Sequence, residues 1–90
     1  MGEKINELAN LLMETGHAHH QVFRETNGFD PEWPIWYADY LVDKLPVYLG
    51  AAMTKSELIY LLVHLSKIQP IDAPGEKWAR YYARYLAQLS

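Results

Sequence analysis

Apolar residues recur at a helical spacing in four segments of the chain, and no stretch keeps up an alternation of apolar and polar residues. Recurrence at i, i+3, i+4 and i+7 indicates amphipathic helices, whereas half-buried strands alternate with a period of two. The pattern therefore predicts an all-α fold, a compact bundle of about four helices in a single domain over residues 1–90. The first helix should cover about residues 3–27, with a stripe formed by Ile5, Leu8, Leu12, Thr15, His19, Val22 and Phe23.

Turn and capping residues predict where the first two helices end and begin. Asn27-Gly28 should stop the first helix, because both residue types adopt the left-handed conformation of a helix C-terminus. Asp30, followed by proline, is a suitable cap for the second helix, and Trp33-Pro34 offers a second possible start. Pro46 lacks a backbone donor and should kink or break that helix before a short turn that ends at Gly50.

The third helix is predicted at about residues 55–69. Thr54 and Glu57 have the spacing of a capping box at its start, and Pro70 should end it. Its sequence LIYLLVHLSKI is apolar on nearly every side, which is typical of a helix in contact with several others. We therefore expect this helix to be central and the most buried. A fourth helix should point Trp78, Tyr82, Tyr85, Leu86 and Leu89 inward.

Composition and charge narrow the classes of function. Cysteine is absent, which makes a reducing cytoplasm the expected location. No apolar run approaches the ~20 residues of a membrane span, and a net charge of −3 disfavours a nucleic-acid partner. Residues 1–45 hold eight acids and three bases, and residues 46–90 hold three acids and five bases. These balances of −5 and +2 should attract the two halves to each other, within one chain or between two.

The segment ETGHAHHQVF places three of the four histidines within four positions. With a rotation of about 100° per residue, His19 points into the apolar stripe, His17 points far round the helix and His20 lies at the edge of the stripe. Only His17 and His20 have the i,i+3 spacing that lets two ligands of one helix bind one ion. A bend at Gly16 would turn His17 inward as well.

Three interpretations of the histidine cluster stay open. His19 can be structural, hydrogen-bonded in the core, with the other two histidines at the surface. His17 or His20 can instead belong to a metal or small-ligand site, with a divalent metal as the candidate cofactor, or the imidazoles can form a pH-sensitive interface. The i,i+4 pair Asp39 and Asp43 favours a site, because two like charges at this spacing need a cationic neighbour. Lys44 and the arginines of the last helix, an imidazolium or a bound ion would supply it.

Two aromatic residues of the second helix are candidates for an interface. Trp36 and Tyr40 are four residues apart and lie opposite Leu41 and Leu45, so they point away from the inferred core. Large aromatic side chains displayed in this way usually mark contact with another molecule, which predicts self-association. The alternative is that Trp36 packs under the N-terminal part of the first helix.

The sequence GHAHH followed by DPEWPIWYADYL resembles a group of small bacterial α-helical proteins of unassigned function, over about residues 14–45. The resemblance implies no activity and no catalytic residue. It implies only that one structural unit contains His17, His19, His20, Trp33, Trp36 and Asp39.

Three classes of function follow in order of preference. The first is a binding or assembly module, a homodimer that uses the aromatic face of the second helix. The second is a metal- or small-ligand-binding protein whose polar site joins His17 or His20 to Asp39 or Asp43. The third is a hydrolytic or lyase-type enzyme with histidine as general base, which ranks last because catalysis needs a sizeable pocket with several convergent polar groups.

Overall fold

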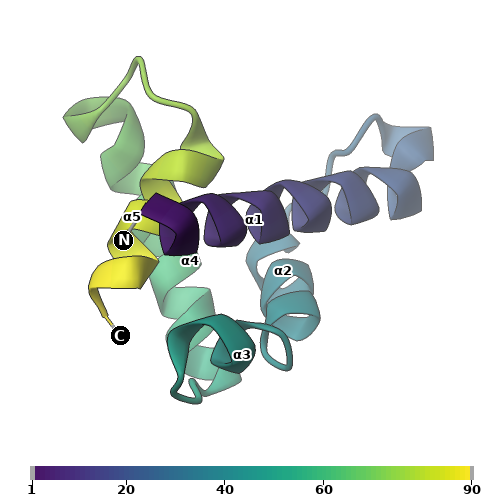
Figure 1. Cartoon of the computed structure of the whole chain (residues 1–90). Helices are drawn as coiled ribbons and strands as arrows, with labels where there is room; N and C mark the ends of the chain where they lie inside the picture. The colour runs from purple at the N-terminus through teal and green to yellow at the C-terminus, as the bar shows by residue number, and fades with distance from the viewer. Residues whose placement is uncertain (1, 90) are drawn as a thin grey trace.

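The computed structural model describes residues 2–89, and this part of the chain contains helices, turns and loops but no strand. The all-α fold predicted from the pattern is confirmed (Figure 1). Five α-helices are present in this range, with a 3-10 turn, η1, after the first. Their bounds are α1 Gly2–Val22, η1 Arg24–Thr26, α2 Trp33–Leu41, α3 Leu45–Leu49, α4 Lys55–Asp72 and α5 Trp78–Gln88.

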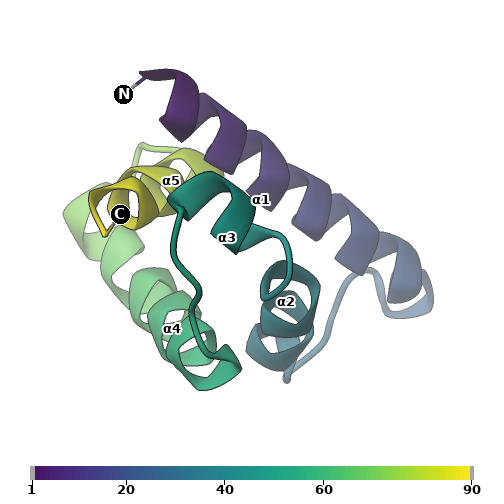
Figure 2. The same cartoon turned by 60° about the horizontal axis from the view of Figure 1, so that its bottom comes forward.

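The longest helix, α1, extends across one side of the molecule (Figure 2). It packs mainly against α5 and also contacts α2 and α3, whereas α4 packs against α2 and α5. The five helices enclose one core. Its fully buried side chains include Leu8, Leu12, Ala38, Leu41, Leu65 and Ala83.

The expectation that the helix over residues 55–69 is central and the most buried is not confirmed. Only Leu58, Leu62 and Leu65 of the 18 residues of α4 are buried, whereas six of the 11 residues of α5 are. The physical reason is that α4 buries a single stripe. Its other apolar residues are only partly buried or are exposed, and Tyr60 is 68% exposed.

The predicted capping box at the start of α4 is confirmed. The Thr54 hydroxyl accepts a hydrogen bond from the backbone N–H of Glu57 (3.1 Å), and the Glu57 carboxylate accepts one from the backbone N–H of Thr54 (2.8 Å). These bonds lower the pKa of Glu57. The prediction that Pro70 ends this helix is wrong by two residues. Proline lacks one backbone hydrogen-bond donor but has a helical φ, so the helix can continue past it. The last turn is closed by the hydrogen bond from the Ala73 N–H to the Gln69 carbonyl (2.9 Å).

The loops that shape the site follow the predicted turn chemistry. Asn27 and Gly28 both have positive φ, 56° and 86°, and the Gly28 N–H donates to the Phe23 carbonyl at 2.8 Å. The α-helix itself ends earlier, at Val22, and the 3-10 turn fills the interval. The second helix breaks earlier than predicted, because α2 ends at Leu41 and Pro46 lies in the first turn of the separate short helix α3, where a proline is tolerated. That helix ends at Leu49, and Gly50 with φ 72° is its C-cap.

Candidate functional site

His19 joins the last turn of α1 to the loop that precedes α2. Its Nε2–H donates to Asp30 Oδ2 at 3.1 Å, and the side chains of His19 and Asp30 are only 7% and 11% exposed. The two groups meet because the Asn27-Gly28 turn sends the chain back along the helix it has just left. The polar pair therefore fastens this loop to α1.

Asp30 uses both of its carboxylate oxygens. Oδ2 accepts from His19, and Oδ1 accepts the backbone N–H of Glu32 at 3.0 Å. The sequence identified Asp30 only as a cap of the second helix, whereas the N-cap position is occupied by Glu32. The signal for its role as a histidine partner was the short Asn27-Gly28 reversal, which brings a residue just after the turn beside the end of α1.

Three aromatic rings surround the His19 imidazole. The Phe23 ring stacks on it with a centroid distance of 4.7 Å, the Trp36 ring meets it edge-on at 5.1 Å, and the Tyr37 ring is tilted against it at 5.3 Å. The ring is thus held in one orientation by packing, with Nε2 directed at Asp30. Since an ionised carboxylate only accepts hydrogen bonds, Nε2 carries a hydrogen.

A hollow opens beside this pair, between the end of α1 and the start of α2, and we call it the α1–α2 hollow. Its volume is about 490 Å³, within the range of small-molecule sites. Phe29, at its rim, is 70% exposed. No lysine or arginine is among the described residues that line it, which are His19, Gly28, Phe29, Asp30, Pro31, Trp33 and Tyr37.

The two other histidines of the cluster do not line the hollow. His20 is exposed and lies over Gly28, where a Cβ atom would come within 2.9 Å of its Nδ1. His17 is exposed. Gly16 does not interrupt α1; instead it gives room to Trp78 and Tyr37, each of which would lie 3.3 Å from a Cβ at this position.

The carboxylates expected at a metal site do not meet the histidines. Asp39 pairs with Lys55 Nζ at 2.5 Å, across the two halves of the chain, and no hydrogen bond or ion pair within residues 2–89 joins Asp39 or Asp43 to an imidazole. In the same range, no group of three or more His, Cys, Asp or Glu side chains could hold a metal ion. The described residues therefore give the metal interpretation no support.

Trp36 and Tyr40 stack on each other with a centroid distance of 5.6 Å and are half-buried against α1. Trp36 meets His19, and the Tyr40 hydroxyl donates to Glu14 Oε2 at 2.5 Å, which raises the pKa of Tyr40. The pair therefore packs on the first helix, but on its C-terminal half instead of the N-terminal part. Lys44 completes this face with its Nζ 3.9 Å from the centre of the Tyr40 ring.

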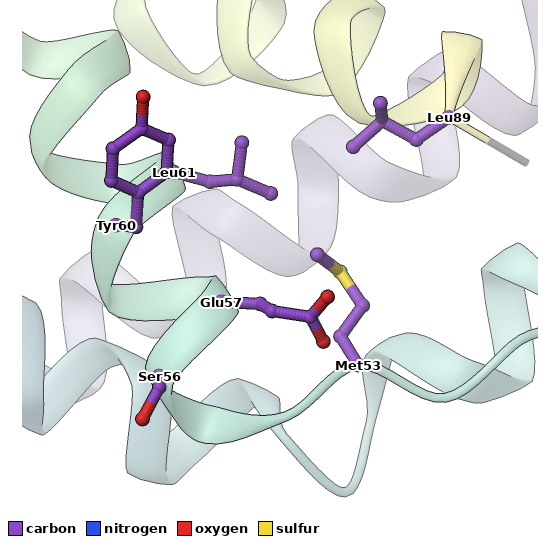
Figure 3. Close-up of a pocket in the computed structure, with 6 residues that line it drawn as sticks. All are labelled: Met53, Ser56, Glu57, Tyr60, Leu61 and Leu89. Atoms are coloured by element: carbon purple, nitrogen blue, oxygen red, sulfur yellow. The ribbon is translucent and has the colours of Figure 1, made fainter.

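A second cavity of about 470 Å³ lies between the start of α4 and the end of α5. In Figure 3, Met53, Leu61 and Leu89 point toward the same space, and Tyr60 and Ser56 lie along α4 beside it. Its one charged group is Glu57, which already holds the capping box. This cavity, which we call the α4–α5 groove, is thus a mostly apolar surface whose charged group is already hydrogen-bonded within the chain.

The buried Tyr82 of α5 predicts a loss of stability at alkaline pH. Burial raises the pKa of Tyr82 to about 12, with a smaller contribution from the charge of Tyr37. In an unfolded chain the pKa of a tyrosine is near 10. This is about two units lower than the pKa of Tyr82 in the folded protein. Because the folded-state pKa is the higher one, the contribution of Tyr82 to stability is complete below about pH 10 and is lost as the pH rises toward about 12.

Circular dichroism recorded together with tyrosinate absorbance measures this effect. The helices should melt as the last tyrosines ionise, and Tyr82→Phe should keep its helices to a higher pH than the wild type. Unfolding of both proteins at the same pH would contradict the assignment to Tyr82.

Comparison of the chain with family models, with curated proteins and with solved structures finds no match. Within residues 2–89, no helix has the length and apolar character needed to cross a membrane. Fold and site together define a small all-α protein in which the α1–α2 hollow has both polar and aromatic walls. Its function is therefore inferred from the residues of that hollow.

Proposed function

We propose that this protein is a small helical binding module and that the α1–α2 hollow is its ligand site. The observation that carries the proposal is the His19–Asp30 pair, which is almost buried and yet forms part of the wall of an open cavity. The absence of cysteine agrees with a cytoplasmic location.

The energetics of burial support a binding role for this pair. Removing an imidazole and a carboxylate from water is costly, and apolar side chains of similar volume often stabilise a fold as well or better. Small-ligand sites typically combine aromatic walls with a few oriented polar groups. The hollow has this composition, since Trp33 and Tyr37 form walls and Asp30 presents an oriented carboxylate.

Binding is preferred over catalysis for the same hollow. A carboxylate that orients an imidazole is also the arrangement that supports a general base. A reaction would need further groups converging on the substrate, and the other lining residues are Gly28, Phe29, Pro31, Trp33 and Tyr37. These side chains contribute apolar surface, an indole N–H and a phenol, which suit recognition.

A screen of small water-soluble molecules against the ¹⁵N-labelled protein tests the proposal. Ligands should shift the backbone amides of residues 28–33 and the Trp33 indole N–H in a saturable manner. Exposed Phe29→Ala should weaken these shifts, whereas Tyr60→Ala, a matched removal of an exposed aromatic residue far along the chain, should leave them unchanged. Binding that maps only to the α4–α5 groove, or no binding at all, would overturn the proposal.

Self-association is a second candidate, and the α4–α5 groove favours it. The groove is apolar, and Tyr60 and Leu89 at its edges are exposed, as expected of a surface that a second copy covers. Trp36 and Tyr40, the interface candidates from the sequence, are half-buried against α1. The groove is therefore the better place for the contact.

Sedimentation velocity over a range of protein concentrations measures the association. A specific dimer interface should bury more than about 1,000 Å² in total. The double variant Tyr60→Asp/Leu89→Asp should be monomeric at concentrations at which the wild type is dimeric. Val47→Asp, another exposed apolar position outside the groove lining, is the matched control. A wild type that stays monomeric at tens of micromolar excludes this candidate.

A further inference from the structure

We infer that the ligand of the α1–α2 hollow is a small organic cation, an ammonium group that carries alkyl substituents. This inference rests on the proposed function of the hollow as a binding site and specifies its ligand chemistry. Two independent properties of the lining lead to it: the arrangement of the aromatic rings and the sign of the charge.

The aromatic rings form a corner. The Trp33 and Tyr37 rings meet at 83° with a centroid distance of 5.4 Å, and both line the hollow. Phe29 adds a third ring at the rim, and because it is 70% exposed, most of its surface is accessible to a ligand. Faces of aromatic rings carry negative charge and attract substituted ammonium groups, for which cages of several rings are the usual binding sites.

The charge of the lining has the sign that a cation requires. Asp30 is the one carboxylate in the lining, and no lysine or arginine is among its described residues. The partners of its two oxygens are the His19 Nε2–H and the Glu32 backbone N–H, so no lysine or arginine of the described chain pairs with this carboxylate. The surrounding segment adds to the effect, because residues 23–32 hold Glu25, Asp30 and Glu32 against Arg24 alone.

These two properties exclude other common ligand classes. An anion would be repelled by the Asp30 carboxylate, and no lysine or arginine is among the described lining residues to bind it. A purely apolar ligand would remove part of the hydration of the Asp30 carboxylate without supplying a hydrogen bond or an opposite charge. An ammonium group with alkyl substituents fits both parts of the lining. Its positive charge is attracted to the Asp30 carboxylate, and its alkyl groups pack against the aromatic rings.

Titration of the ¹⁵N-labelled full chain with choline, and in parallel with its uncharged isostere 3,3-dimethyl-1-butanol, tests this inference. The two probes have the same shape and differ in the charge at one atom. Choline should shift the Trp33 indole N–H and the amides around Asp30, and should bind about tenfold or more tightly than the neutral alcohol, as expected for a desolvated cation–π contact supplemented by a carboxylate.

Two variants separate the contributions of charge and aromatic surface. Asp30→Asn keeps the shape and an oxygen for the Glu32 N–H, and should remove the preference for choline. Phe29→Leu changes an exposed ring that the fold does not need and should weaken choline alone, while Tyr60→Leu should have no effect. Thermal melts of each variant verify that it is folded, and Phe29→Leu keeps the test valid if Asp30→Asn unfolds.

The outcomes distinguish this inference from the proposed function. Equal affinities for choline and the neutral alcohol, both mapping to the hollow, would overturn the cation inference and leave the binding site in place. Failure of every small molecule to bind at the hollow would overturn both. A choline preference that survives in Asp30→Asn and in Phe29→Leu would show that the cation binds elsewhere and would also overturn the inference.

Discussion

Replacing Leu12 by alanine should lower the free energy of unfolding by about 2–5 kcal/mol, because a fully buried leucine leaves both lost contacts and a cavity behind. Leu12 is 0% exposed and lies in the middle of α1, the helix that packs against α5, α2 and α3. A loss of this size is a large fraction of the roughly 5–15 kcal/mol that stabilises a domain. Denaturant unfolding followed by circular dichroism measures it.

The adjacent residue provides the control. Met13 is 53% exposed, and Met13→Ala removes a side chain of similar size from the same helix with little effect on helix propensity. Its unfolding free energy should stay within about 0.5 kcal/mol of the wild type. Equal losses in the two variants would show that α1 does not bury the face described above.

Replacing His19 by leucine should lower the free energy of unfolding by about 1–3 kcal/mol, although the new side chain is more apolar. The change leaves the Asp30 carboxylate, which is 11% exposed, without its imidazole partner. The matched control is His17→Leu, the same substitution at an exposed position two residues earlier, which should change stability by less than about 0.5 kcal/mol.

A double-mutant cycle isolates the pair itself. His19→Leu and Asp30→Asn should be non-additive, with a coupling free energy of about 0.5–3 kcal/mol, because each change removes the same hydrogen bond. Additive effects would mean that His19 stabilises the fold only through its contacts with Phe23, Trp36 and Tyr37.

The fold was largely predictable because its signals are local. The Thr54–Glu57 capping box and the Gly50 stop follow from a few neighbouring residues. The burial of a helix is not local in this way. The apolar sequence of α4 shows that it can be buried on every side, but the helices around it are too few to cover it, and Tyr60 stays exposed.

The site was predictable only in part, for the same physical reason. The helical rotation of residues 17–20 predicts that His19 points inward, where the structure places it. Its partner depends on how a loop returns to the helix, and helical spacing carries no information on that path. The carboxylates expected from the i,i+4 pattern, Asp39 and Asp43, lie outside the hollow, and the loop residue Asp30 meets the imidazole instead.

Gly16 connects the packing of the helices to the shape of the hollow, although it is not part of the lining. The space that its missing side chain leaves is filled by Trp78 of α5 and by the hydroxyl of Tyr37, whose ring is a wall of the hollow. A methyl group at position 16 would press on that wall from behind. We therefore expect a mutation at this position to change the width of the hollow from inside the core, while every residue that lines the hollow stays the same.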